Sequence, residues 1–288
     1  MSKADIVRYY QSSQWLYRLF CYNKDTLGIH FGFWEKDTKS RQEAMVNQDK
    51  EIIKVGVIKK GDRVLDAGCG VGGTAIYIAK IIGARVTGIS LDPKQVRAAC
   101  EHAKEKEVGE RVDFLVGDYT KMDFANDTFD VVYGNESICY ASPKASFLKE
   151  ALRVLKPGGR LVVADGYCAY APKTKEEKEI VEAFKESFAL EEMITGQRMS
   201  EEMKKAGFDK VMAISKTTQV VPSIVEWGKM ADKATIVANI ARWMPIDEMQ
   251  AIYRNMMAMK MAVKAHRIGL AAYWIHRGIK PRAAKLRK

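Results

Sequence analysis

The clearest pattern along the chain is an alternation of short apolar runs with longer amphipathic stretches, which begins near residue 62. The short runs have the length and β-branched content of strands, and they lie at 63–67, 85–89, 112–116, 129–133 and 160–165. The intervening stretches predict helices at 74–82, 92–106 and 143–154. Strands that alternate with helices are typical of a parallel sheet with crossover helices, so this part of the chain predicts an α/β fold.

The segments on either side follow other patterns. Before the alternation, we predict an aromatic-rich helix at 5–22, a loop at 28–34 and an amphipathic helix at 39–58. After it, we predict helices at 173–191 and 199–205, with strands at 208–217 and 269–277 that pair as an antiparallel hairpin at the sheet edge. A methionine-rich helical insertion separates these strands, and we expect it to lie over the open end of the sheet. The predicted division is a helical cap (1–60), a core (61–221), a helical lid (222–267), and a last strand with a basic tail (268–288).

The turn after the first predicted strand carries the strongest chemical signal. It reads Asp66-Ala-Gly-Cys-Gly-Val-Gly-Gly73 and leads into a helix. Glycines at such a turn let a ligand approach the bare backbone. Their spacing also satisfies the dinucleotide fingerprint, which is a weak signal alone. Asp66 decides between ligands, because a carboxylate suits an ammonium group and is awkward beside a pyrophosphate. S-adenosylmethionine carries an ammonium and a sulfonium and has no phosphate, so the loop favours it over NAD.

Composition narrows the setting of this chemistry. The chain has 288 residues, of which 47% are hydrophobic, enough for a large core. Its five cysteines show neither paired nor metal-ligand spacing, and we predict reduced thiols and no metal site. The first residues do not have the pattern of a signal peptide, and we see no apolar stretch long enough to span a membrane. We therefore expect a cytoplasmic protein.

Positive charge is concentrated at one end of the chain. The formal net charge is +11, and the segment 249–288 contributes ten Lys and Arg residues with no acid. One interpretation is a solvated basic tail. The other is attraction to an anionic membrane surface or to an anionic substrate such as a diphosphate head group. No nucleic-acid-binding module accompanies the charge, so we do not expect a nucleic-acid partner.

Four motifs, in order, resemble those of the class I S-adenosylmethionine-dependent methyltransferases. They are Val64–Gly73, Gly117-Asp118, Phe129–Val132 and Leu155–Leu161. Within that superfamily, Thr87–Gln95 is similar to the second motif of tocopherol, sterol and cyclopropane-fatty-acid methyltransferases. The segment Tyr133–Ala141 resembles sterol C-methyltransferases, and its Asn135-Glu-Ser137 is similar to geranyl diphosphate C-methyltransferases. The resemblance implies a Rossmann-like, mostly parallel sheet with an antiparallel last strand and a helical cap.

The resemblance also assigns residues to the cofactor. Asp118 ends the third strand, where the family holds the adenine amino group, and Tyr119 is expected to stack nearby. Many methyltransferases grip the ribose with an acid at the end of the second strand; here Ser90 and Gln95 are expected to do so, and Asp92 is the competing candidate. The full set of predicted cofactor residues is Asp66, Gly68, Cys69, Gly70, Gly72, Ser90, Leu91, Gln95, Asp118, Tyr119 and Asn135.

Glu136 is the leading catalytic candidate. It follows the fourth strand, at the carboxyl end of the sheet where open α/β folds place ligands. Its apolar neighbours would raise the pKa of the carboxylate, which suits a general base. The alternative is a residue that orients the substrate or caps the next helix. His30 is a second candidate, as base or substrate ligand. The aromatic and methionine-rich helices form either ordinary core or an apolar acceptor chamber. The predicted acceptor residues are Tyr10, Trp34, Tyr140 and Trp243.

The combined expectation is a methyltransferase that acts on a small lipophilic acceptor, isoprenoid or lipid-like, with C-methylation favoured. The rival within the enzyme class is O- or N-methylation of a polar or phenolic metabolite. A catalytically silent cofactor-binding module and a nucleic-acid methyltransferase are the remaining alternatives. The predicted partner is a small molecule, prenyl-diphosphate-like where it is anionic, and the sequence leaves the oligomeric state open.

Overall fold

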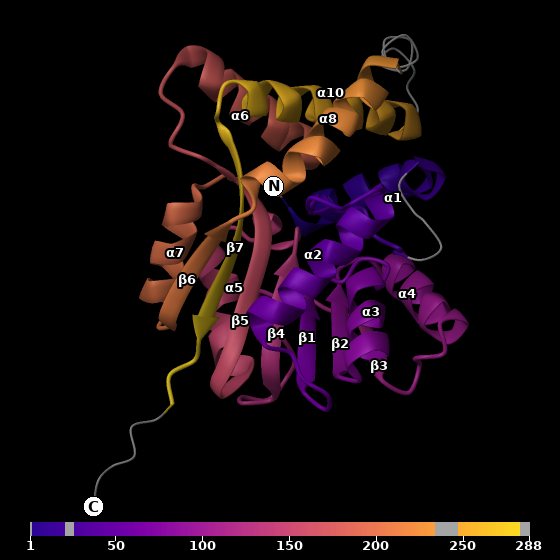
Figure 1. The fold of residues 1–288 in the computed structure, drawn as a ribbon, viewed down its shortest axis with the longest axis vertical. Coiled ribbons are helices and arrows are strands. Elements are labelled where there is room, and N and C mark those ends of the chain that lie inside the picture. The colour runs from indigo at the N-terminus through magenta and orange to yellow at the C-terminus, as the bar shows by residue number, and fades with distance from the viewer. Residues whose placement is uncertain (1, 21–25, 234–246, 283–288) are drawn as a thin grey trace, which may run out of the picture. The chain divides into compact units, whose positions relative to one another are not determined.

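A computed structural model describes residues 2–20, 26–233 and 247–282 of the chain. Within these ranges the strands form a seven-stranded sheet in the order β3-β2-β1-β4-β5-β7-β6 (Figure 1). The strands are β1 (Arg63–Ala67), β2 (Arg85–Ser90), β3 (Val112–Val116), β4 (Phe129–Asn135), β5 (Leu155–Cys168), β6 (Asp209–Ser215) and β7 (Ala271–Ile279). The first five strands pair in parallel, and the C-terminal strands are antiparallel. The predicted α/β fold and the edge position of the last two strands are confirmed.

The largest difference from the predicted strands concerns β5. We predicted a strand at 160–165, but β5 starts at Leu155 and passes through the Pro157-Gly-Gly159 segment. The chain fits by a register shift in the β4–β5 pairing, because Phe129 lies opposite Leu155 and Val131 lies opposite Arg160. Backbone hydrogen bonds between residues 158–159 and Lys280 satisfy the polar groups there, so the proline and glycines do not end the strand.

The helices follow the predicted segments closely. They are α1 (Lys3–Phe20), α2 (Arg41–Gly56), α3 (Gly73–Ile82), α4 (Pro93–Glu105), α5 (Lys144–Val154), α6 (Lys175–Phe188), α7 (Gly196–Lys205), α8 (Thr217–Lys233) and α10 (Asp247–Arg267), with a 3₁₀ turn η1 (Ile138–Tyr140). The Asp92-Pro93 start signal is confirmed, since Asp92 Oδ1 accepts the Lys94 N–H at 2.9 Å. None of the described helices has both the length and the apolar character that a membrane span requires.

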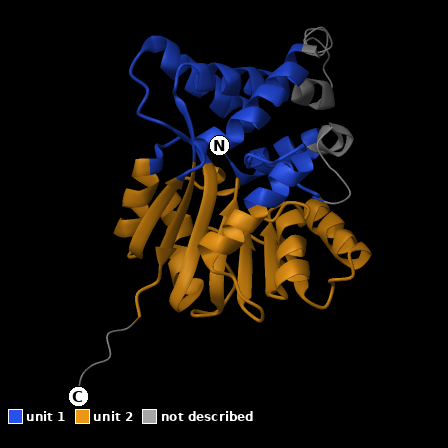
Figure 2. Cartoon of the chain, viewed as in Figure 1, with its two compact units in different colours: residues 1–48, 166–196, 215–273 blue, residues 49–165, 197–214, 274–288 orange. Residues whose placement is uncertain are grey.

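The chain groups into two compact units (Figure 2). Unit 1 comprises residues 1–48, 166–196 and 215–273 and contains α1, α6, α8 and α10, with α10 packed on the other three. Unit 2 comprises residues 49–165, 197–214 and 274–288 and contains the glycine loop and most of the sheet. The boundaries interrupt β5 and β7, which each run through residues of both units. The four-segment division stays a prediction.

The core of unit 2 explains why its strands read as apolar runs. Fully buried pairs of consecutive residues occur in neighbouring strands: Val64 and Leu65 in β1, Val131 and Val132 in β4, and Leu161–Ala164 in β5. Consecutive residues of a strand face opposite sides, so both faces of the sheet are covered. The parallel strands end at one edge, which brings the residues after β1, β2 and β4 together there.

Candidate functional site

The loop between β1 and α3 has the backbone geometry of a ligand cradle. Gly68 has φ 97°, and a Cβ there would lie 2.5 Å from the Cβ of Ser137. Gly70 has φ 54°, but a Cβ at that position would meet no heavy atom within 4 Å. The first glycine is therefore needed for packing, whereas the second leaves bare backbone beside open space. A ligand that lies against the backbone fits this loop, and the assignment of its glycines to the cofactor stays a prediction.

Asp66 places a buried carboxylate at the start of the same loop. It is 3% exposed, and its Oδ2 accepts a hydrogen bond from the Tyr133 hydroxyl at 2.6 Å. Burial raises the pKa of Asp66 to about 7, against the lowering effect of the Tyr133 hydrogen bond. A bound cation would favour the ionised form, because opposite charges stabilise each other in a site of low dielectric. These residues fit the ammonium end of S-adenosylmethionine.

A second buried carboxylate, Asp49 of α2, lies close to Asp66 and was not predicted. Its Oδ1 accepts a hydrogen bond from the Thr74 hydroxyl at 2.8 Å, and Thr74 Oγ1 accepts one from Asn135 Nδ2 at 3.2 Å. Burial raises the pKa of Asp49 to about 7. The sequence contained a usable signal: Asp49 stands at helical spacing with the buried Met45 and Ile52, so an acid occupies the apolar stripe of an amphipathic helix.

The end of β2 brings Ser90 and Gln95 together. The Ser90 hydroxyl donates to Gln95 Oε1 at 2.8 Å, and both side chains are buried. Asp92 caps α4, and its backbone N–H donates to Ser90 Oγ at 3.2 Å. Leu91 lies half-buried between them. Asp92 therefore has a structural role at this turn, whereas the Ser90–Gln95 pair offers polar atoms held together for a sugar. The ribose assignment stays a prediction.

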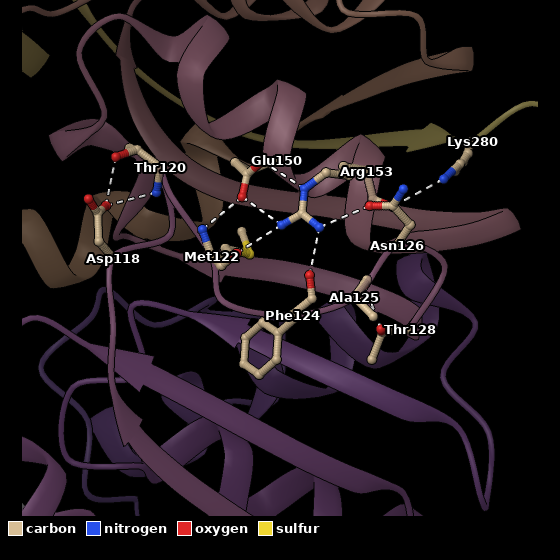
Figure 3. Close-up of polar contacts among 10 residues, drawn as sticks. All are labelled: Asp118, Thr120, Met122, Phe124, Ala125, Asn126, Thr128, Glu150, Arg153 and Lys280. Carbon is tan, nitrogen blue, oxygen red and sulfur yellow. Dashed lines mark hydrogen bonds and ion pairs between the residues drawn. The ribbon is translucent and has the colours of Figure 1, made fainter.

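The loop that carries Asp118 is held in place by α5 (Figure 3). Asp118 Oδ1 accepts from both the backbone N–H and the hydroxyl of Thr120, at 2.8 and 2.7 Å. Further along the loop, Arg153 donates to the carbonyl oxygens of Met122 and Phe124 at 2.9 and 2.6 Å, and Glu150 Oε2 accepts the Met122 N–H. Arg153 was not predicted, because its spacing on α5 resembles that of any exposed basic residue.

Tyr119 connects this loop to the segment that follows β4. Its hydroxyl donates to the Ser137 carbonyl oxygen at 2.9 Å, and its ring packs edge-on against Phe147 at a centroid distance of 5.4 Å. A Cβ on Gly68 would lie 3.7 Å from the Tyr119 ring. Cys69 is buried in the loop itself, and burial raises the pKa of its thiol well above the ordinary value. The predicted cofactor residues of unit 2 thus surround one end of the sheet.

Glu136 stands directly after β4 in a strained conformation. Its φ is 52°, in the left-handed region that non-glycine residues rarely adopt, at a cost of about 1 kcal/mol. Its backbone N–H donates to the Ala164 carbonyl at 2.8 Å, and the Cys139 N–H donates to the buried Asp165 carboxylate at 2.8 Å. These bonds fix the half-buried Glu136 at the edge of the sheet that also carries Asn135. Tyr140 follows on η1 and is half-buried.

The other predicted catalytic and acceptor residues belong to unit 1. His30 is buried, and its Nδ1 lies 2.8 Å from the Phe31 carbonyl oxygen. Trp34 Nε1 donates to the Ser223 hydroxyl at 2.9 Å, and Tyr10 packs edge-on against Tyr9. Trp243 lies outside the described residues. The roles of these residues stay predictions.

Unit 1 encloses an apolar cavity of about 70 Å³, several times the space that one water needs. Its apolar lining includes Phe31, Tyr167, Phe184, Met193, Ile224 and Leu270. Thr217 also lines it, but its hydroxyl accepts the Tyr273 backbone N–H at 3.0 Å. The imidazole of His266 also lines the cavity.

Comparison with known proteins identifies the segment that holds the glycine loop. Residues 65–163 match the family model described as a methyltransferase domain. The chain carries a class I S-adenosylmethionine-dependent methyltransferase domain. This confirms the predicted family, fold and cofactor.

Two curated relatives and one solved structure illustrate the range of this similarity. The chain is 35% identical over 137 residues to 27-O-demethylrifamycin SV methyltransferase of Amycolatopsis mediterranei, covering 48% of this chain and 50% of that protein. It is 38% identical over 135 residues to sterol 24-C-methyltransferase of Saccharomyces cerevisiae, covering 47% and 35%. The structure of geranyl diphosphate C-methyltransferase from Streptomyces coelicolor superposes with a TM-score of 0.72, at 17% identity, over 96% of this chain and 97% of that one.

The chain spans about half or less of the length of these curated relatives. The matched part is the methyltransferase domain, and the relatives include both O- and C-methyltransferases. The domain therefore establishes the class of chemistry, and the acceptor must be argued from the chain's own residues.

Several basic residues of the C-terminal segment have acidic partners within the fold. Lys280 lies 2.6 Å from Asp127, and Lys264 lies 3.0 Å from Glu176. Lys260 lies 4.0 Å from Asp232. Part of the concentrated positive charge is therefore offset inside the molecule, while residues 283–288 lie outside the described ranges.

Proposed function

We propose that this protein transfers a methyl group from S-adenosylmethionine to a small lipophilic acceptor of isoprenoid or lipid-like character, with carbon as the favoured target. The observation that carries the proposal is the apolar cavity of unit 1, whose lining is mostly aromatic and aliphatic. Binding of an apolar ligand in such a pocket is favourable, because it removes apolar surface of the ligand from water. The similarity to a sterol C-methyltransferase supports the same acceptor class.

In the proposed mechanism the protein aligns two reactants and excludes water. The cofactor supplies a methyl group bound to a positively charged sulfur. Transfer of that methyl group to an alkene carbon of the acceptor would release S-adenosylhomocysteine and leave the acceptor as a carbocation. Aromatic faces would stabilise the cation, and the cavity lining supplies such faces at Phe31, Tyr167 and Phe184. Glu136 would then remove a proton from the adjacent carbon and regenerate an alkene.

The alternative is O- or N-methylation of a polar or phenolic metabolite, which the similarity to an O-methyltransferase supports. An oxygen or nitrogen nucleophile has a lone pair and needs no carbocation stabilisation. Glu136 or His30 would then orient the nucleophile or accept its proton. The two proposals differ in the solubility of the product.

Partition of the product tests the acceptor class. Purified protein is incubated with S-adenosylmethionine labelled on the methyl group and an extract separated into organic and aqueous fractions. We expect label in the organic phase, where mass spectrometry identifies the product. Label that stays aqueous after phosphatase treatment would favour the polar acceptor, whereas label released to the organic phase by phosphatase indicates a prenyl diphosphate.

Substitution of Glu136 tests the catalytic assignment. Glu136→Gln keeps the size and the backbone strain but removes the base, so we expect turnover to fall by about 10³-fold with cofactor affinity within about twofold. Glu110→Gln is the matched control, because Glu110 is exposed and lies outside the loops of the site. Turnover retained in Glu136→Gln would remove Glu136 from the role of base.

A further inference from the structure

The strongest unassigned feature of unit 2 is the hydrogen-bonded chain from Asp49 through Thr74 to Asn135. Asp49 is 2% exposed and comes from α2, whereas Thr74 is the second residue of α3 and Asn135 ends β4. The first turn of α3 contains no acid. The N-cap residue, Gly72, has no side chain that could accept a hydrogen bond from the first N–H groups of the helix. A neighbouring helix therefore supplies the carboxylate at this helix N-terminus.

When Asp49 is ionised, as it largely is at pH 8, the chemistry of the three groups fixes the direction of every bond. Asp49 Oδ1 accepts, so the single hydroxyl proton of Thr74 points toward Asp49 across the 2.8 Å contact. Thr74 Oγ1 then has only lone pairs to offer, so Asn135 must turn its NH₂ group toward Thr74 across the 3.2 Å contact. The carbonyl oxygen of the Asn135 amide consequently faces the opposite way.

The strand register shows on which side of the sheet this amide lies. Tyr133 and Asn135 are two residues apart on β4, so their side chains share one face. Tyr133 pairs with Asp66 in the β1–β4 register, and its hydroxyl donates to Asp66. Asn135 is therefore on the face of the sheet that carries the buried carboxylate predicted to hold the cofactor's ammonium.

We propose that Asp49 is a positioning residue that fixes the amide orientation of Asn135, so that Asn135 Oδ1 accepts a hydrogen bond from the amino-acid end of the cofactor. The inference rests on the proposed assignment of Asp66 and Asn135 to that end. An asparagine at position 49 can donate to Thr74, which frees the hydroxyl proton to turn toward Asn135. The amide of Asn135 can then reverse and present its NH₂ group to the ammonium, which repels it.

The test compares two ligands by calorimetry. S-adenosylhomocysteine carries the amino-acid end, and 5′-methylthioadenosine lacks it but keeps the adenosine. We expect Asp49→Asn and Thr74→Val each to weaken S-adenosylhomocysteine binding about tenfold, as for loss of a hydrogen bond to a charged group, with 5′-methylthioadenosine affinity unchanged. Thr74→Ser keeps the hydroxyl and should bind as the wild type does. Asp49→Asn combined with Asn135→Ala should be no weaker than Asn135→Ala alone.

Three outcomes would contradict parts of this account. Equal loss of both ligands in Asp49→Asn and Thr74→Val would indicate a merely structural role and overturn the positioning role. Independent losses in the double variant would overturn the coupling between Asp49 and Asn135. If Asp66→Asn and Asn135→Ala themselves leave S-adenosylhomocysteine affinity unchanged, the assignment of the cofactor end fails, and the inference about Asp49 fails with it.

Discussion

The cofactor loop of unit 2 and the apolar cavity of unit 1 are built in opposite ways. The loop is one turn, residues 66–74, which would hold its ligand through its backbone conformation and one carboxylate. The lining of the cavity comes from loops, the end of β5, the start of β7 and the helices α6, α8 and α10, which are far apart in sequence. A ligand held by backbone requires particular residues at consecutive positions, whereas an apolar ligand requires only volume and side chains of the right kind. The cofactor loop can therefore be recognised in the sequence as a motif, whereas the apolar cavity cannot.

The largest effect on cofactor affinity should follow from a methyl group added to the loop. Gly70→Ala places a Cβ in the open space beside the backbone, and we expect S-adenosylhomocysteine affinity to fall by about 100-fold as contact with the backbone is lost. Gly61→Ala is a matched control, because Gly61 also has a positive φ with nothing within 4 Å of its Cβ position, but it precedes β1 at the opposite end of the strand. Both variants should lose about 1 kcal/mol of unfolding free energy. Equal cofactor affinity in the two variants would show that the ligand does not approach Gly70.

A bulky residue in the cavity should separate acceptor binding from cofactor binding. Ala262 lines the cavity, and Ala262→Phe would fill part of its volume. We expect kcat/KM for the acceptor to fall by about 30-fold while cofactor affinity stays unchanged. Val225→Phe adds a similar side chain at an exposed position of α8 and serves as the control. A normal kcat/KM in Ala262→Phe, measured with the acceptor identified by product partition, would exclude the cavity as the acceptor site.

This contrast also explains what the sequence allowed us to predict. The strand–loop–helix order, the glycine loop and Asp66 were predicted because each depends on local backbone geometry. Asp49 and Arg153 were missed because their partners, Thr74 and the carbonyls of 122 and 124, are brought to them by tertiary packing. The extent of β5 was underestimated because the backbone groups around Pro157 are satisfied by Lys280, more than a hundred residues away. Sequence patterns report local requirements, and these contacts are not local.

The pH dependence of the loop follows from its buried carboxylates. Burial raises the pKa of Asp66 and of Asp49 to about 7, so both are largely ionised at pH 8 and largely protonated at pH 6. A cationic ligand needs the ionised form, so its affinity should fall by about tenfold between pH 8 and pH 6. The stability of the ligand-free protein should change in the opposite direction, because the folded state binds more protons than the unfolded state in the window from about 4 to 7, and stability therefore falls as pH rises through it. Calorimetric titrations and thermal unfolding at both pH values check the two signs. A flat affinity profile in the wild type would show that neither carboxylate acts on the cofactor's charge.

The smallest effect should come from the anchor of the Asp118 loop, which acts on the cofactor only through loop order. Arg153→Met keeps the apolar stem of the side chain but removes its hydrogen bonds to the Met122 and Phe124 carbonyl oxygens, and we expect about threefold weaker S-adenosylhomocysteine binding. Amide hydrogen exchange at 118–128 should accelerate, whereas exchange in the glycine loop should not. Arg85→Met at an exposed position is the control. Faster exchange with unchanged affinity would mean that Asp118 and Tyr119 are ordered by their own contacts. The cofactor site would then depend on the consecutive residues of its loops more than on the distant side chains that contact those loops.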